Sequence, residues 1–154
     1  MSRDIKFRAW QKYHKTMLEV LDIGFEDGEV NSLKVKYPED TIPNVVIYKK
    51  NDEKFWLDDC IKLMQYTGLE DKNGRKIYEG DIVSSYAQTG KESSRSIIVW
   101  EDEESSSGWN IKVIKDFYPP KQEGCIISIS RNDVMDYEVI GNIYENPELL
   151  NINK

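Results

Sequence analysis

Three acidic residues in the middle of the chain are the first candidates for chemistry. Asp71 is followed at short spacing by Glu79 and Asp81. Carboxylates grouped in this way can hold a divalent cation or act as a general base. They also stand beside the turn-forming Gly74 and Gly80, and an aspartate at such a place commonly accepts hydrogen bonds from backbone N–H groups. The turn signals therefore favour a structural role for this cluster over catalysis.

Nucleophilic and zinc chemistry have few residues to draw on. The chain contains one histidine, His14, and two distant cysteines, Cys60 and Cys125. A zinc site takes about four such ligands at characteristic spacing, which this sequence cannot assemble. No phosphate-binding glycine loop, nucleophile elbow or paired-histidine motif occurs either. We expect both thiols to be reduced, buried and inert, and the protein to be a non-enzyme without a metal or cofactor.

The charge distribution bears on the class of partner. The net charge is −7, and residues 101–154 alone carry five basic and eleven acidic groups. A nucleic-acid binder needs a dense basic surface, so the acidity disfavours one. The acidic run 101–104 could mimic DNA phosphates, but such runs usually solvate a hairpin tip. The one basic patch that the sequence offers lies in residues 1–15, which contain Arg3, Lys6, Arg8, Lys12 and Lys15.

Aromatic residues offer a candidate binding surface. Trp10 and Tyr13 accompany the basic patch, and Trp100 and Trp109 flank the acidic run. Such rings can line a peptide groove, as in SH3 domains, or stack nucleic-acid bases. They can also be core residues, and apolar groups on both faces of these segments leave the two readings open. The candidate surface consists of Arg8, Trp10, Tyr13, Trp100 and Trp109.

The kind of hydrophobic residue predicts the fold class. Ile and Val number 27 together, whereas Leu and Ala number only 10, and nine tyrosines lead the aromatic residues. β-branched and aromatic side chains suit a pleated sheet, while Ala and Leu are the helix formers. With 154 residues, the chain has the length of one domain or two very small ones. A mainly β fold with little helix is therefore predicted.

Short strands separated by turns give the expected organisation. A hairpin is predicted from residues 4–10 and 16–23, and another from 97–100 and 109–114, with a mobile polar loop at 87–96. Asp71 to Gly74 forms the clearest turn and divides the chain into an N-terminal β module, 1–70, and a C-terminal SH3-like β barrel, 71–150. The two modules can also pack as one roll. Many short strands without a long helical pattern are typical of such barrels.

The beginning of the sequence lacks the apolar core of a signal peptide, and no apolar run approaches the ~20 residues of a membrane span. We therefore expect a cytoplasmic protein without a membrane partner.

Several blocks of residues stand out along the chain: Ile5 to Trp10, Gln65 to Gly74, Ile77 to Val83, and Val139 to Leu149. Together these blocks resemble the YopX family of phage and prophage proteins. They occur in order and extend over nearly the whole chain. The resemblance implies an SH3-like β-barrel type of fold and an origin in a virus or prophage of a low-GC Gram-positive bacterium. It brings no catalytic residue or ligand.

Within these blocks, the residues that we expect to serve the fold are Thr67, Gly68, Asp71, Asn73, Gly74, Tyr78, Gly80, Asp81, Gly141, Asn142 and Pro147. The function expected is that of a phage or prophage accessory protein, a β-barrel module that binds a protein of phage or host. The alternative is a small barrel that binds nucleic acid, and a metal-dependent hydrolase using Asp71, Glu79 and Asp81 ranks third.

Overall fold

The computed structural model describes residues 4–38, 45–49, 60–103, 106–118, 122–129 and 136–151. These residues form eleven strands and a short 3-10 helix, which confirms the prediction of a mainly β fold. By its internal contacts the chain divides into two units, one of residues 5–65 and the other of residues 1–4 with 66–154. The sequence predicts the division at residue 70, and the contacts place it at residue 65.

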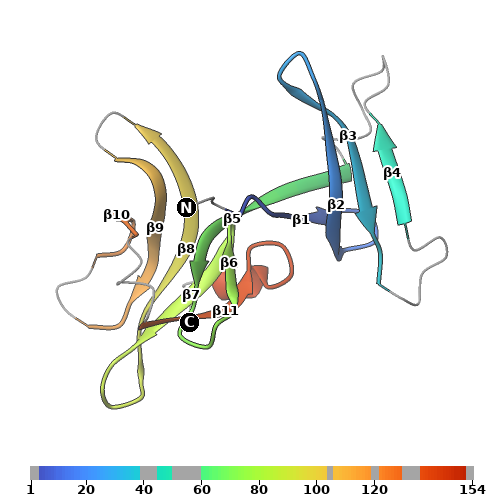
Figure 1. The fold of residues 1–154 in the computed structure, drawn as a ribbon. Coiled ribbons are helices and arrows are strands. Elements are labelled where there is room, and N and C mark those ends of the chain that lie inside the picture. Colours follow the sequence, from blue (N-terminus) through green and yellow to red (C-terminus); the bar gives the residue numbers. More distant parts are fainter. Residues whose placement is uncertain are drawn as a thin grey trace. The chain divides into compact units, whose positions relative to one another are not determined.

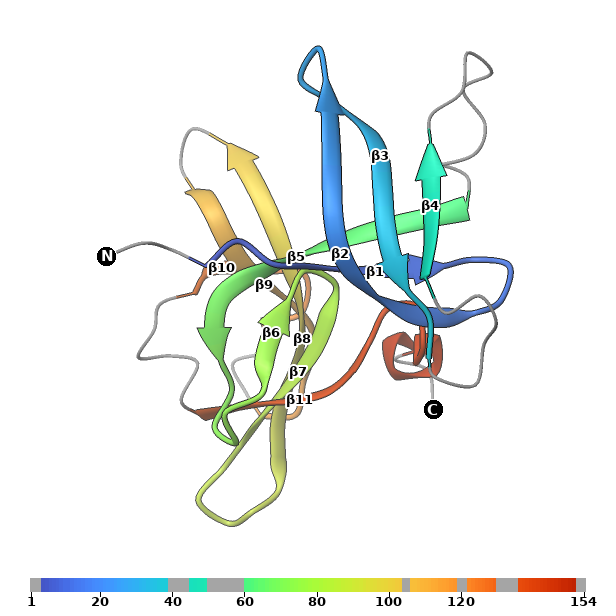
Figure 2. The ribbon, with the colours of Figure 1, turned by 45° about the vertical axis from the view of Figure 1, so that its right-hand side comes forward.

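The unit of residues 5–65 is an antiparallel sheet in the order β4-β3-β2-β1-β5. Figure 2 shows its long strands β2 and β3 side by side with β4. The hairpin expected near the start is present, and a second tight turn at Asp27 and Gly28 has positive φ at both residues, as a right-twisted hairpin requires. The bounds are β1 Phe7–Gln11, β2 Thr16–Glu26, β3 Glu29–Lys36, β4 Val45–Lys49 and β5 Ile61–Glu70.

Buried aliphatic side chains from all of the first three strands form the core of this unit. Ala9, Leu18, Leu33 and Val35 are at most 1% exposed, and Ile61 of β5 packs with them. The polar residues alternate with these along β3 and face outward, which is the period-2 pattern of a half-buried strand.

The unit that begins at Tyr66 contains a five-stranded antiparallel sheet in the order β10-β9-β8-β7-β11. In Figure 1 its two longest strands, β8 and β9, curve together in yellow and orange. The core consists of Ile77, Val83, Ile98, Ile111 and Val139. The elements are β6 Lys76–Tyr78, β7 Asp81–Tyr86, β8 Glu92–Glu103, β9 Ser106–Asp116, β10 Ile126–Ser128, β11 Tyr137–Asn142 and the 3-10 helix η2 Pro147–Leu150.

The predicted mobile loop at 87–96 is wrong in its second half, because β8 already begins at Glu92. Serine hydroxyls provide the missing signal: Ser85 Oγ lies 2.6 Å from Ser93 Oγ and 2.7 Å from Ser94 Oγ across the strand pair. Glu92 accepts hydrogen bonds from Ser84 and Arg95. Polar cross-strand pairs therefore extend a strand that the composition alone assigns to a loop.

The prediction that both thiols are buried is right for Cys60 and wrong for Cys125, which is exposed; neither forms a disulfide. Cys125 directly precedes β10, an edge strand whose residues are all exposed. An edge strand is covered on fewer sides than a central one, so an apolar residue type there is no guarantee of burial.

This difference predicts selective labelling. In the native protein without reductant, an alkylating reagent should modify Cys125 rapidly and leave Cys60 unmodified, because reaction requires solvent access to the sulfur. Mass spectrometry should therefore show a single label per native chain and a second after denaturation. Equal labelling rates for the two thiols in the native protein would contradict the structure.

Candidate functional site

The turn after β5 is fastened to β11 by one carboxylate. Asp71 is 6% exposed. Its Oδ1 accepts hydrogen bonds from the backbone N–H groups of Asn73 at 2.8 Å and Arg75 at 2.9 Å, and its Oδ2 accepts one from Val139 N–H at 3.0 Å. Gly74 completes the turn with φ +77°, a value that an L side chain rarely adopts. Asp71 therefore shapes its own turn and binds the neighbouring strand.

The electrostatics of Asp71 follow from these bonds. Burial raises the pKa of a carboxyl group, but the backbone hydrogen bonds from Val139, Arg75 and Asn73, with the nearby Arg75 charge, outweigh it. The pKa of Asp71 therefore lies below its usual value. The carboxylate is held ionised for the fold, whereas a general base needs a pKa near the working pH.

The second candidate carboxylate, Asp81, begins β7 and is fully buried. Its Oδ2 accepts a hydrogen bond from Tyr78 N–H at 2.8 Å, across the turn that contains Gly80. Gly80 has φ +76°, and its N–H donates to Ile98 C=O while its C=O accepts from Ile143 N–H. The turn residues thus tie β7 to β8 and to the segment after β11.

Thr67 and Gly68 make the irregularity near the end of β5. Thr67 Oγ1 donates to Ile77 C=O at 2.9 Å and accepts from Leu69 N–H at 3.1 Å. Gly68 has φ +85°, and the pairing of β5 with β6 shifts between Tyr66 and Glu70. This is the arrangement of a β-bulge, in which a glycine accommodates the extra residue.

The last motif block organises the end of the chain. Asn142 Oδ1 accepts hydrogen bonds from Tyr144 N–H at 3.0 Å and Glu145 N–H at 2.9 Å. A Cβ at Gly141 would meet the Asn146 side chain at 2.5 Å, so a larger residue here requires Asn146 to move. Pro147 is the first residue of η2, where its missing N–H costs nothing.

The motif residues are therefore distributed over several turns and do not converge on one reaction centre. Among the described residues, no group of three or more His, Cys, Asp and Glu side chains is placed so that it could hold a metal ion.

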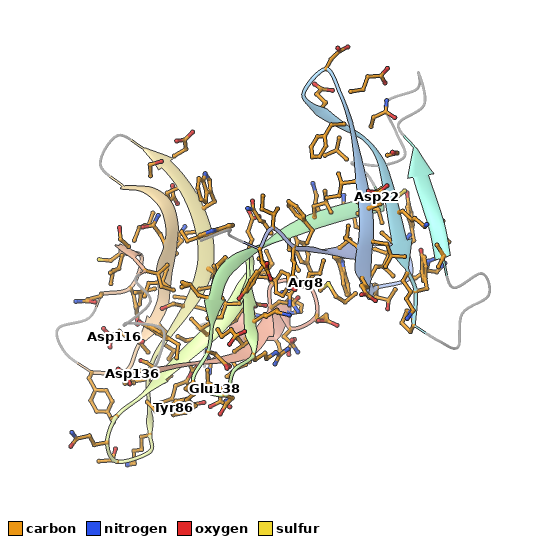
Figure 3. The ribbon with its side chains drawn as sticks, in the orientation of Figure 1. Arg8, Asp22, Tyr86, Asp116, Asp136 and Glu138 are labelled. Atoms are coloured by element: carbon orange, nitrogen blue, oxygen red, sulfur yellow. The ribbon has the colours of Figure 1, made fainter. Side chains whose placement is uncertain are left out.

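Lys72, in the turn after β5, contacts both β11 and the Tyr86 side chain. Its N–H donates to Tyr137 C=O at 2.9 Å, and its Nζ lies 2.7 Å from Glu138 Oε2 and 4.2 Å from the centre of the Tyr86 ring. The hydrogen bond that Lys72 donates to the Glu138 carboxylate raises the pKa of Lys72. Tyr86 is thereby held beside β11; Figure 3 labels Tyr86, Asp136 and Glu138 at the ends of β7 and β11.

Next to Tyr86 lies an open pocket of about 560 Å³, which we call the seam pocket. Its walls come from the two edge strands of the five-stranded sheet, β10 and β11, and from β7 and β9 between them. The sheet must therefore curl until its edges face one another, as in an incompletely closed barrel. The lining residues are Ser85, Tyr86, Gln88, Ile111, Ile127, Ser128, Ile129, Asp136 and Tyr137.

Of the five residues predicted as a binding surface, three lie in the unit of residues 5–65. Tyr13 is 72% exposed, but Trp10 is 8% exposed, and Arg8 donates to the Met64 sulfur at 3.8 Å. Of the two rings expected beside the basic patch, the structure therefore buries Trp10 and leaves Tyr13 exposed. Arg3 of the predicted basic patch lies outside the described residues.

The other two aromatic residues form a pair in the C-terminal sheet. Trp100 and Trp109 are direct cross-strand partners, with ring centres 5.0 Å apart at 78°, and Trp100 is 47% exposed. Trp109 packs against the core cluster. Neither lines the seam pocket. Sequence reasoning missed the pocket, since its residues come from four strands and only the closely spaced isoleucines of 126–129 gave a signal.

The sequence model of the YopX protein family matches residues 6–151. This chain belongs to the YopX family. The resemblance seen in the separate motif blocks is thereby confirmed.

Two solved bacterial proteins are similar to this YopX-family chain. The crystal structure of protein EF1440 from Enterococcus faecalis is 27% identical, with 97% of this chain and all of that chain covered and a TM-score of 0.67. Protein yopX from Bacillus subtilis is 18% identical over 96% of this chain and 97% of its own, with a TM-score of 0.49. A search of curated proteins found no significant match. In the described part of the chain, no helix is long and apolar enough to cross a membrane.

The role of Asp71 makes a prediction about pH and stability. Because its folded pKa lies below the unfolded value of about 3.9, its contribution is present above that pH and is lost as the pH falls towards the folded pKa. Asp71→Asn should lower the free energy of unfolding by about 1–3 kcal/mol at neutral pH. It should also flatten the decline of stability in acid.

Urea unfolding at a series of pH values measures both effects. The control is Asp102→Asn, which removes the same charge at an exposed position and should change little. If Asp71→Asn unfolds with the wild-type pH dependence, the carboxylate does not fasten the fold.

Proposed function

We propose that this YopX-family chain is a non-enzymatic accessory protein of a bacterial virus or prophage, and that it binds a protein through the seam pocket. The observation that carries the proposal is an open, partly apolar pocket of about 560 Å³ at the meeting of two sheet edges. This volume lies in the range of ligand sites. Ile111 and Ile127 supply apolar wall, and Tyr86 and Tyr137 supply rings with polar tips, the mixture typical of protein-binding surfaces.

Exposed apolar side chains at the same place support a macromolecular ligand. Ile127 and Tyr86, which both line the pocket, are each 38% exposed. Burying such groups gains about 25 cal/mol per Å² of apolar surface. A partner chain that covered them would gain this free energy and protect an edge that otherwise invites aggregation.

A binding role is favoured over catalysis because two of the three candidate carboxylates, those of Asp71 and Asp81, already serve the fold. Asp71 and Asp81 accept hydrogen bonds from the backbone and are at most 6% exposed. A metal-dependent hydrolase would need such oxygens to be open to a cation and a water molecule. The burial and hydrogen bonds of Asp71 and Asp81 therefore disfavour a metal-dependent hydrolase.

A protein partner is favoured over nucleic acid on two grounds. Trp10, one of the two rings beside the predicted basic patch, is 8% exposed, which leaves only Tyr13 there for stacking. Residues 101–154, which supply much of the pocket, carry a net charge of −6, which repels a phosphate backbone.

We propose that the partner is met in the cytoplasm of the bacterial host.

Site-specific photo-crosslinking tests the proposal. A photoreactive p-benzoyl-phenylalanine in place of Ile127, in the full chain expressed in a Gram-positive host during prophage induction, should give a discrete adduct. Because the proposed partner is a protein, the adduct should be sensitive to protease and resistant to nuclease.

The matched control carries the same photoreactive residue in place of Phe25, which is 65% exposed in the other unit, and it should give no such adduct. Adducts at both positions, or a nuclease-sensitive adduct at position 127, would contradict a protein site in the seam pocket.

A further inference from the structure

In the part of the chain that the structure describes, β10 pairs with another strand, β9, on one side only. In its pairing with β9, Val113 N–H donates to Cys125 C=O, and Ile129 N–H donates to Trp109 C=O. In an antiparallel pair the residues alternate between bonding the partner and facing away from it. Residues 125, 127 and 129 therefore bond to β9, and the N–H and C=O groups of Ile126 and Ser128 face the opposite direction.

The other edge of the sheet is closed. On β11, Tyr137 C=O accepts from Lys72 N–H, and Val139 N–H donates to Asp71. Val139 C=O accepts from the Arg75 guanidinium at 3.3 Å. Among the described strands of this sheet, β10 is therefore the edge at which a further strand can add.

The charge that the described lining residues bring to the seam pocket is negative. Asp136 is the only acidic or basic residue among the lining residues that the structure describes. It is exposed, and within the described part of the chain it has no ion-pair partner. Glu138, two residues further along the same strand, is neutralised by Lys72. A cation entering the pocket therefore meets the unpaired carboxylate of Asp136.

We infer that the occupant is an extended, basic segment of the partner protein that adds to β10 as a strand. The inference rests on the proposed function and names the chemistry of its partner. The backbone of the segment bonds to Ile126 and Ser128, an aliphatic side chain lies beside Ile127, and a Lys or Arg reaches Asp136. Because side chains on one face of a strand recur every second residue, the aliphatic and basic residues are separated by one residue.

Selection from a random peptide library against the full chain tests the sequence pattern. Enriched peptides should combine aliphatic and basic residues at this spacing and should bind more weakly as salt concentration rises. In a selected peptide, backbone N-methylation should weaken binding by about tenfold at alternate positions only, because only alternate N–H groups face β10.

Two pairs of protein variants locate the contacts. Ser128→Pro removes the outward N–H, which an edge strand tolerates, and should weaken binding by about tenfold, whereas Ser128→Ala keeps the N–H and should bind as the wild type. Asp136→Asn should weaken binding about fivefold and reduce its salt dependence, while Asp102→Asn, an equal change of charge outside the pocket, should not. Circular dichroism of each variant establishes that it is folded.

The peptide experiments test strand addition by a basic segment, and the crosslink tests protein binding at the seam pocket. Enriched peptides that are acidic or neutral, or that tolerate N-methylation at every position, would overturn the inference, as would the absence of any enriched peptide. The crosslink at position 127 decides the proposed function independently: a protein adduct there leaves the protein-binding role standing even if strand addition fails.

Discussion

The carboxylate of Asp71 is the constraint on which the C-terminal sheet depends. Its two oxygens join the turn after β5 to the N–H of Val139 on β11, strands that are far apart in the sequence. This contact also places Lys72 against Glu138 and the Tyr86 ring. One edge of the sheet is thereby closed and one wall of the seam pocket is positioned, while β10 remains open.

A buried carboxylate is costly unless its charge is compensated. Asp71 meets this requirement with three backbone N–H donors, and fully buried Asp81 with a hydrogen bond from Tyr78 N–H. Hydrogen bonds to a charged acceptor are about twice as strong as neutral ones. The same bonds explain why two residues that look catalytic in the sequence serve the fold. Asp136 differs from both, because its carboxylate is exposed and has no ion-pair partner within the described residues.

The sequence predicts the parts of this structure that depend on local chemistry. Ile and Val content indicates the sheets, Asn73-Gly74 and Glu79-Gly80-Asp81 indicate the turns, and the motif blocks indicate the family. Trp10 shows the limit: Ala9 and Trp10 point to opposite faces of β1, and both are buried. Alternation cannot reveal that both faces are covered, because the covering elements come from elsewhere in the chain.

The seam pocket could not be predicted for a related reason. Ile127 and Asp136 acquire a common site only when the sheet curls and its two edges face one another. Strand curvature and edge closure are set by long-range contacts such as Asp71 with Val139, which leave no periodic signal. Cys125 became exposed for the same reason, as its neighbours belong to an edge strand.

Residue-resolved amide hydrogen exchange on the native protein tests the asymmetry of the two edges most directly. The account predicts slow exchange for Val139 N–H, which donates to Asp71, and for Ile127 N–H, which faces β9. Ser128 N–H faces away from β9 and should exchange fast. Equal protection of Ser128 and Ile127, or rapid exchange at Val139, would contradict a sheet that is closed at β11 and open at β10.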